Sequence, residues 1–142
     1  MEAAVLTIDD LRPGMSASYS KTFNQADIDE YGKLSGDMNP VHFDPEFARH
    51  TVFGGTIAHG MLSAGLISTV LGMKLPGAGC IALGVNLRFR APVRPGDTVT
   101  ATCTVKTIDK IKRRVTLDCN CKVKDTVVVE GEALVMAPAG RA

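Results

Sequence analysis

A carboxylate and an imidazole, Asp37 and His42, lie five residues apart in the segment LSGDMNPVHFD, residues 34–44. On a straight helix these two side chains would diverge by roughly 140°, and on a strand they would face opposite sides. Gly36 permits unusual backbone angles, and the proline after Asn39 disfavours the helical conformation there. A turn could therefore aim both groups at one water molecule, because a histidine that titrates near neutrality can give and take a proton. An Asx-turn with a capping aspartate and a structural histidine explains the same residues, so both interpretations stay open.

A second candidate patch is the start of the apolar segment GMLSAGLISTVLG, residues 60–72. Its polar side chains are only serines and a threonine, so a helix here must be enclosed by the rest of the domain. The N-terminus of that helix offers unpaired N–H groups and partial positive charge. Gly60 has no side chain to block a carbonyl group, so its N–H could stabilise negative charge that develops on the oxygen. Tight packing at a helix start explains the same glycine, and His59 is interpreted as structural.

The elements that must position these groups differ between the two halves of the chain. The first half is expected to be helical with loops. Asn24 and Asp27 suit a capping box before a helix over residues 25–34, and Asp44 suits the N-cap of a short helix that ends at Arg49. In the second half hydrophobic residues alternate with polar ones, as in an antiparallel sheet with one buried face. The sequence therefore predicts an α+β fold, an antiparallel sheet wrapped around a central apolar helix.

The composition is that of one ordinary domain. The 142 residues fit a single domain over residues 1–142, in which only residues 138–142 are expected to form a loose tail. A formal net charge of +1 gives no overall attraction to nucleic acid or to a membrane. No leader and no bilayer-spanning segment is evident, so we expect a soluble, cytoplasmic protein. The four cysteines are expected to be reduced and buried, as small hydrophobic residues of the core.

Three segments resemble the MaoC-like family of (R)-specific enoyl-CoA hydratases and hydroxyacyl-thioester dehydratases. Residues 31–48 (YGKLSGDMNPVHFDPEFA) resemble its hydratase 2 motif. Residues 55–62 (GTIAHGML) and 86–93 (NLRFRAPV), the latter followed by PGD, resemble the family in the same order and spacing. The family has the hot-dog fold, in which a sheet wraps a long central helix and two such units commonly dimerise. The resemblance therefore implies a hot-dog domain and a homodimer, and a second copy would also cover exposed surfaces and edges of the predicted sheet.

The resemblance also implies a reaction, the reversible syn hydration of trans-2-enoyl-CoA to (3R)-hydroxyacyl-CoA. Asp37 and His42 would be the catalytic pair, and Asn39 would help to shape their loop. Gly60 would donate its N–H to the thioester carbonyl, and Ser68 would reach from the helix towards Asp37. No cofactor and no metal is implied, because CoA is part of the substrate. The substrate would be an acyl-CoA or an acyl-carrier-protein thioester, and a carrier-protein-linked dehydratase is the first alternative.

Other functions fit the sequence less well. Hot-dog folds also host thioesterases, but hydrolysis does not explain the Asp-x-Asn-Pro-x-His loop as well as hydration does. A non-catalytic subunit that binds acyl thioesters would not need both acid/base residues. A metal site made of His42, His50 and His59 lacks the His-x-x-x-His spacing of many zinc sites. The basic run KIKRR at residues 110–114 is interpreted as a solvated hairpin, or else as a contact for CoA phosphates or an acidic carrier protein.

Overall fold

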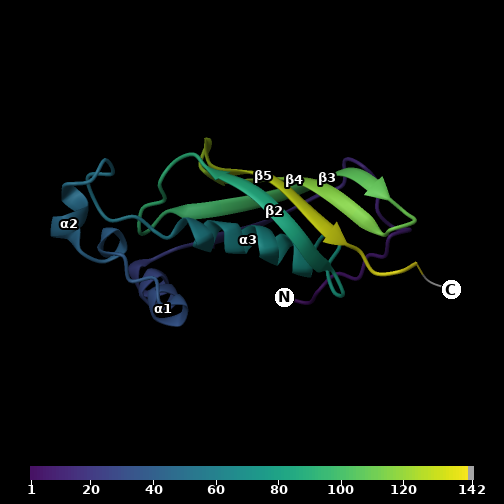
Figure 1. Ribbon diagram of the computed structural model, residues 1–142, viewed down its shortest axis with the longest axis horizontal. Coiled ribbons are helices and arrows are strands. Elements are labelled where there is room, and N and C mark those ends of the chain that lie inside the picture. The colour runs from purple at the N-terminus through teal and green to yellow at the C-terminus, as the bar shows by residue number, and fades with distance from the viewer. Residues whose placement is uncertain (141–142) are drawn as a thin grey trace.

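A computed structural model describes residues 1–140, and residues 141 and 142 of the predicted tail lie outside the described part. Along the chain the elements are β1 (Ser16–Thr22), α1 (Gln25–Ser35), the 3-10 helix η1 (Pro40–His42), α2 (Pro45–Arg49), α3 (Gly60–Met73), β2 (Ile81–Phe89), β3 (Thr98–Asp109), β4 (Arg114–Val123) and β5 (Thr126–Met136) (Figure 1). The carbonyl of Pro138 accepts a hydrogen bond from the N–H of Ile8 at 2.9 Å. This part of the predicted tail is therefore tied to the N-terminal segment.

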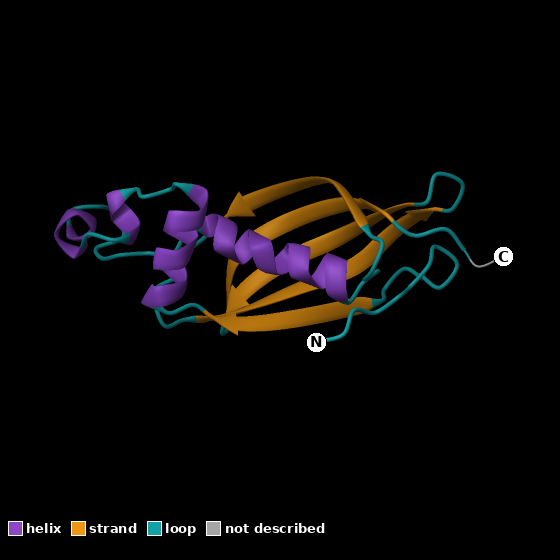
Figure 2. Cartoon of the chain, turned by 90° about the horizontal axis from the view of Figure 1, so that it is seen from below, coloured by secondary structure: helices purple, strands orange, loops and turns teal. Residues whose placement is uncertain are grey.

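The strands form one antiparallel sheet in the order β1-β3-β4-β5-β2. Helix α3 lies across one face of the sheet, while α1, η1 and α2 gather beyond one end of it (Figure 2). Side chains that point from the sheet towards α3 are buried on every second residue of β3 and β4, as the alternation predicts: Val99, Ala101, Cys103, Val105, Val115, Leu117, Cys119 and Cys121. The predicted α+β architecture, a sheet around a central helix, is confirmed.

The cysteines behave as the sequence predicts in three cases out of four. Cys103, Cys119 and Cys121 are buried free thiols, whereas Cys80 is only half-buried. Burial raises the pKa of Cys121 to about 12, and its thiol donates to the carbonyl of Ser63 at 3.3 Å. Cys121 is therefore protonated at neutral pH and serves as packing in the core.

The prediction that α3 is enclosed is wrong for one of its sides. Leu66, Ile67, Val70 and Leu71 are buried against the sheet, but Met61 is 58% exposed. Edge strand β2 is exposed as well, although large hydrophobic residues alternate with small or polar ones along it. Strand β2 has a neighbouring strand on one side only, and of its leucine, isoleucine, valine and phenylalanine side chains Leu87 alone is partly buried against the core in the described chain. We call this surface the α3–β2 face: Met61, Ile81, Leu83, Val85 and Phe89. None of the described helices is long and apolar enough to cross a membrane.

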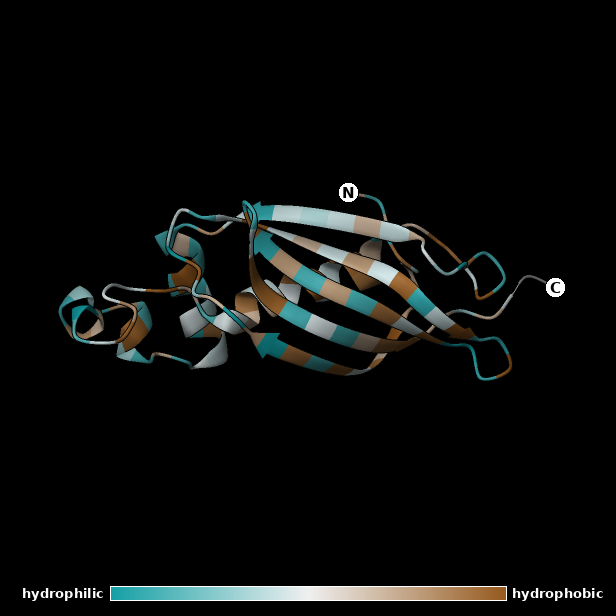
Figure 3. Ribbon diagram, turned by 90° about the horizontal axis from the view of Figure 1, so that it is seen from above, coloured by the Kyte–Doolittle hydropathy of each residue, from teal (hydrophilic) through white to brown (hydrophobic). Residues whose placement is uncertain are grey.

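Strand β1 was not predicted, because its segment SASYSKT carries little hydrophobic signal. It pairs with β3 through a row of hydroxyl contacts on the outer surface of the sheet. Ser18 and Thr102 lie 2.7 Å apart, and Ser20 and Thr100 lie 2.6 Å apart. Seen from above, the sheet alternates hydrophilic and hydrophobic residues along its strands (Figure 3). Cross-strand side-chain pairs of this kind stabilise a sheet without a strongly apolar sequence.

Candidate active site

The loop that carries Asp37 begins where α1 ends. The predicted capping box is present at the start of α1, between Asn24 and Asp27, and Gly36 ends the helix with a left-handed φ of 84°. The N–H of Gly36 donates to the carbonyl of Gly32 at 2.9 Å. A residue with a side chain would be strained at this φ, so the glycine is what lets the chain leave α1 in this direction.

Two successive side-chain caps then shape the loop. One oxygen of the Asp37 carboxylate accepts the N–H of Asn39 at 3.3 Å. The side-chain oxygen of Asn39 accepts the N–H of Val41 at 3.2 Å and so caps η1. The Asx-turn that the sequence suggested is therefore present. It leaves Asp37 exposed, with a further carboxylate oxygen and other lone pairs available for a bound water.

His42 is buried, with only 7% of its surface exposed. Its Nδ1 lies 2.8 Å from the carbonyl oxygen of Ile57. A carbonyl oxygen can only accept, so Nδ1 carries the hydrogen and Nε2 presents its lone pair. This hydrogen bond fixes both the tautomer and the orientation of the ring, which a general base requires.

The structure brings Asp37 and His42 together and adds His59 to them. One donor atom from each of the three residues lies within 4.8 Å of the other two. His59 is 2% exposed, its Nε2 lies 2.9 Å from the carbonyl oxygen of Asp37, and its ring stacks on that of His42 at 3.8 Å between centroids. The turn predicted from Gly36 and the proline after Asn39 is what makes the pair converge.

The sequence interpretation treated His59 as merely structural, and one signal argued against that. His59 is the N-cap of α3, a position that favours serine, threonine, aspartate or asparagine, and its side chain makes no cap hydrogen bond. A histidine there serves something other than the helix. Asp37, His42 and His59 are also the described residues whose donor atoms could surround a metal ion.

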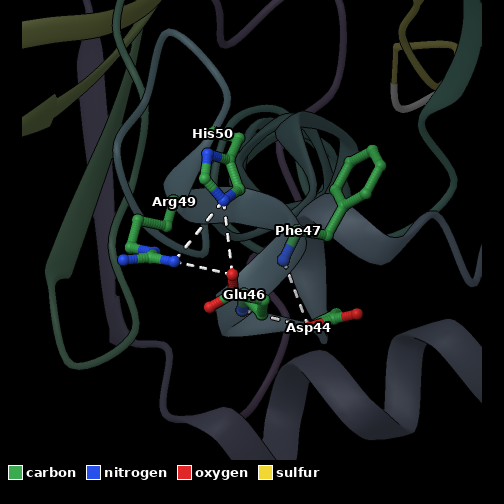
Figure 4. Close-up of polar contacts among 5 residues, drawn as sticks. All are labelled: Asp44, Glu46, Phe47, Arg49 and His50. Atoms are coloured by element: carbon green, nitrogen blue, oxygen red, sulfur yellow. Dashed lines mark hydrogen bonds and ion pairs between the residues drawn. The ribbon is translucent and has the colours of Figure 1, made fainter.

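His50 is not part of this group, so the metal site of His42, His50 and His59 is not formed. It lies at the end of α2, where its Nε2 is 3.3 Å from Glu46, which also pairs with Arg49 at 2.6 Å (Figure 4). These side chains are largely exposed. The carboxylate of Asp44 caps the same helix through the N–H groups of Glu46 and Phe47, as predicted.

Gly60 follows His59 and is the first residue of α3. Among the described residues its N–H has no hydrogen-bond partner, which an oxyanion donor requires. Gly60 lines a cavity of about 420 Å³, here the Gly60 cavity, together with Phe53, Ile57, Met61 and Phe89. A Cβ on Gly60 would lie 2.7 Å from the ring of Phe89. The glycine therefore allows Phe89 to pack closely against the start of the helix, and Gly60 itself is exposed.

Ser68 is not brought to Asp37 within this chain. It is exposed on α3, and no hydrogen bond joins it to Asp37 in residues 1–140. The rise of an α-helix carries Ser68 about 12 Å along the axis from Gly60. Ser68 lines a second cavity of about 530 Å³, here the Ser68 cavity, on the α3–β2 face. The two cavities are neighbours, because Met61 and Phe89 line both of them.

One arginine that sequence analysis did not single out holds the loop before α3. The guanidinium of Arg94 donates to the carbonyls of Gly55 at 3.2 Å and Phe53 at 2.5 Å. The basic run lies elsewhere, in the exposed hairpin between β3 and β4. Strand β3 has 12 residues, which at roughly 3.3 Å per residue place that hairpin at the far end of the sheet from Arg94. Within this chain the basic run does not join the site.

Comparisons with known proteins place most of the chain in one family. The family described as MaoC like domain matches residues 11–128. A protein of Rhodospirillum rubrum named (R)-specific enoyl-CoA hydratase is 52% identical over 131 residues, which cover 92% of this chain and 91% of the relative. A 3-hydroxybutyryl-CoA dehydratase of Methylorubrum extorquens is 44% identical over 96% of this chain and 87% of its own. The solved structure of the (R)-hydratase from A. caviae involved in PHA biosynthesis has a TM-score of 0.86 and 43% identity, covering 90% and 98% of the two chains.

Proposed function

The chain belongs to the MaoC-like domain family, and on that premise we propose that it catalyses the reversible hydration of trans-2-enoyl-CoA to (3R)-hydroxyacyl-CoA. The observation that carries the proposal is the convergence of Asp37 and His42, whose donor atoms lie within 4.8 Å of each other. Relatives at 52% and 44% identity bear the names of an (R)-specific enoyl-CoA hydratase and a 3-hydroxybutyryl-CoA dehydratase. The same chemistry therefore supports both directions of the reaction.

In the proposed reaction a water molecule donates its hydrogens to the Asp37 carboxylate and to Nε2 of His42. Its oxygen then attacks C3 of the enoyl group while one of the two residues takes a proton from the water, and that proton is passed on to C2, so that both residues end as they began. Water and double bond thus yield a hydroxyl group at C3 and a new C–H bond at C2 on the same face. The Ile57 carbonyl sets the tautomer of His42. The Asx-turn sets the position of Asp37.

Negative charge that develops on the thioester oxygen requires a donor. We assign this role to the N–H of Gly60, the first residue of α3. At its N-terminus a helix presents unpaired N–H groups and partial positive charge. A backbone donor in a fixed position costs no reorganisation during the reaction. Gly60 is adjacent in sequence to His59, which contacts both Asp37 and His42, so donor and acid/base pair share one end of α3.

The two cavities beside Gly60 provide room on either side of a thioester bound there. The Ser68 cavity, at about 530 Å³, is the more apolar of the two and suits an acyl chain. The Gly60 cavity, at about 420 Å³, includes Arg90 in its lining and suits the pantetheine arm. Ser68 would then contact bound substrate, instead of reaching towards Asp37. No cofactor other than the CoA of the substrate enters this scheme.

We further propose that two copies of the chain associate through the α3–β2 face. Edge strand β2 offers unpaired backbone groups along an apolar surface, on which Val85 is 58% and Phe89 55% exposed. Monomeric proteins seldom leave such an edge uncovered, and closed two-fold pairing is the commonest solution. Four free cysteines also suit a reducing compartment, so we place the dimer in the cytoplasm.

The proposed reaction is tested by following enoyl absorbance with short, medium and long trans-2-enoyl-CoA substrates and then separating the product enantiomers. We expect loss of absorbance without release of free thiol, and (3R)-hydroxyacyl-CoA as the product. Free thiol would instead indicate a thioesterase. Predominant (3S) product would mean that the substrate is presented to Asp37 and His42 by its other face.

A further inference from the structure

We propose that His59 is a positioning residue that fixes the Asp37 loop against the ring of His42. The proposal rests on the proposed function, in that these two residues carry the acid/base chemistry. His59 makes no cap hydrogen bond with α3, so capping of the helix does not account for a histidine that is 2% exposed.

The first contact of His59 holds the backbone of Asp37. Its Nε2 lies 2.9 Å from the Asp37 carbonyl oxygen, which can only accept, so Nε2 carries the hydrogen. This bond joins residue 37, which follows a left-handed glycine, to the first turn of α3. Apart from it, the hydrogen bonds of Asp37 within residues 1–140 are local ones to Ser35 and Asn39. The hydrogen bond from His59 thus sets where the loop lies relative to the helix.

The second contact holds His42. The two imidazole rings stack at 3.8 Å with planes inclined by 28°, and the Nδ1–H of His42 donates to Ile57. His42 is therefore fixed at one edge by a carbonyl and on one face by His59. Rotation of its ring would break both contacts, so His59 restrains the direction of the Nε2 lone pair. One side chain thereby connects the two members of the acid/base pair.

The second ring nitrogen of His59, Nδ1, has no hydrogen-bond partner in the described chain. A proton there would be a buried donor with no acceptor. The groups that face the ring are His42, Phe43 at 5.6 Å and, from α1, Tyr31 at 4.7 Å, besides the Asp37 carbonyl. A carboxylate oxygen of Asp37 also lies within 4.8 Å of one of the ring nitrogens. His59 is assigned a role in geometry, and the pH profile of its variants distinguishes this role from that of an acid or base.

Three substitutions separate the two contacts. In His59→Gln the amide nitrogen can still donate to Asp37, but the stacked ring is lost. His59→Phe keeps a ring against His42 but cannot donate, and His59→Ala removes both contacts. Misplacement of a catalytic group by about 1 Å can cost on the order of 10²-fold in rate. We expect that loss in kcat for His59→Ala, smaller losses for the other two variants, and an unchanged KM.

The matched control is His50→Gln, because His50 is an exposed histidine just after α2 whose ring, in the described part of the chain, pairs with Glu46 and Arg49. It should leave kcat unchanged. The shape of the pH profile gives a second readout. A positioning residue lowers the plateau of kcat and leaves both limbs of the profile in place, whereas loss of a limb in His59→Gln would make His59 an acid or base and overturn the proposal. Unchanged kcat in folded His59→Ala, or a raised KM alone, would also overturn it.

A crystal structure of His59→Ala or His59→Gln keeps the test independent of the proposed function. We expect the Asp37 loop to move away from α3 and the His42 ring to turn, which would lengthen the distance between the carboxylate and Nε2. Unchanged positions of both residues would contradict the proposal even if the wild-type protein proved to catalyse another reaction. Conversely, if wild type lacks hydratase activity while the loop moves as expected, the proposed function fails and the positioning role stands.

Discussion

The imidazole rings of His42 and His59 stack with their centroids 3.8 Å apart. A metal ion shared by both rings would have to lie between two nearly parallel planes, whereas the lone pair of a ring nitrogen lies in the plane of its own ring. The stacked arrangement therefore suits a water molecule hydrogen-bonded to His42 and Asp37 better than an ion held by both histidines. Proton transfer is the chemistry that the proposed reaction requires of Asp37 and His42.

Removal of metal ions tests this interpretation. Dialysis against EDTA should leave hydration of an enoyl-CoA unchanged, because the proposed steps move only protons between water, Asp37 and His42. Added Zn²⁺ should inhibit if it acts at all, because it would bind the lone pairs that the water needs. Activity that disappears on dialysis and returns with a divalent cation would contradict the scheme.

Substitution of Gly60 tests the oxyanion donor. A Cβ here would lie 2.7 Å from the Phe89 ring, so that ring must shift and the backbone becomes less accessible. Gly60→Val should lower kcat/KM by on the order of 10²-fold, as the loss of one oxyanion donor does, and Gly60→Ala should have a smaller effect. Near-normal kcat/KM in folded Gly60→Val would remove Gly60 from the mechanism.

A glycine on the same helix provides the control. A Cβ on Gly72 would have no atom within 4 Å. Gly72→Ala should therefore stabilise α3 by roughly 0.5–1 kcal/mol, because alanine loses less conformational entropy than glycine in a helix. Gly60→Ala should show no such gain in the free energy of unfolding, owing to the contact with Phe89. Denaturant titration of both variants measures the difference.

Substitution of Arg94 tests the support of the Gly60 cavity. Its guanidinium bridges the carbonyls of Phe53 and Gly55, and Phe53 lines that cavity. Lysine cannot reproduce two bonds from one planar group, so Arg94→Lys should raise KM and lower the free energy of unfolding by about 1–2 kcal/mol. Steady-state kinetics and denaturant titration check the two effects. Unchanged KM would mean that the loop before α3 does not shape substrate binding.

The proposed dimer is tested by a charge on the α3–β2 face. Val85 on β2 is 58% exposed, and Val52, which lies outside that face, is 96% exposed. Light scattering should give a dimer for wild type and for Val52→Lys, but a monomer for Val85→Lys, because an unpaired charge would be buried in the interface. A monomeric wild type, or a dimeric Val85→Lys, would exclude pairing through this surface.

Sequence patterns predicted those parts of the fold that depend on residues close together in the sequence, such as helix caps and strands with one buried face. The caps at Asn24 and Asp44 and the alternation in β3 and β4 are local and strong, and each is found where expected. Strand β1 escaped prediction because hydroxyl pairs with β3 hold it, and such pairs appear only once both strands are placed. The exposure of α3 and β2 also could not be read from hydrophobicity, because an apolar surface reserved for another molecule has the same composition as a core.

The site shows the same division. Gly36 and the proline after Asn39 predicted a turn that could bring Asp37 and His42 together, and the structure contains it. The part played by His59 depends on contacts across 22 and 17 positions of sequence, to Asp37 and His42, which no local pattern reveals. The reach of Ser68 towards Asp37 is not seen within residues 1–140 of one chain and stays a prediction.

The most direct test of the central claim is the kcat of Asp37→Asn for hydration of a trans-2-enoyl-CoA. Asparagine keeps the shape of the side chain and its cap to the N–H of Asn39, but it cannot take a proton from water. With His42→Ala measured beside it, each variant should lose at least about 10²-fold in kcat, the usual scale for general acid–base catalysis. Near-normal turnover by folded Asp37→Asn would contradict the assignment of this carboxylate to the reaction.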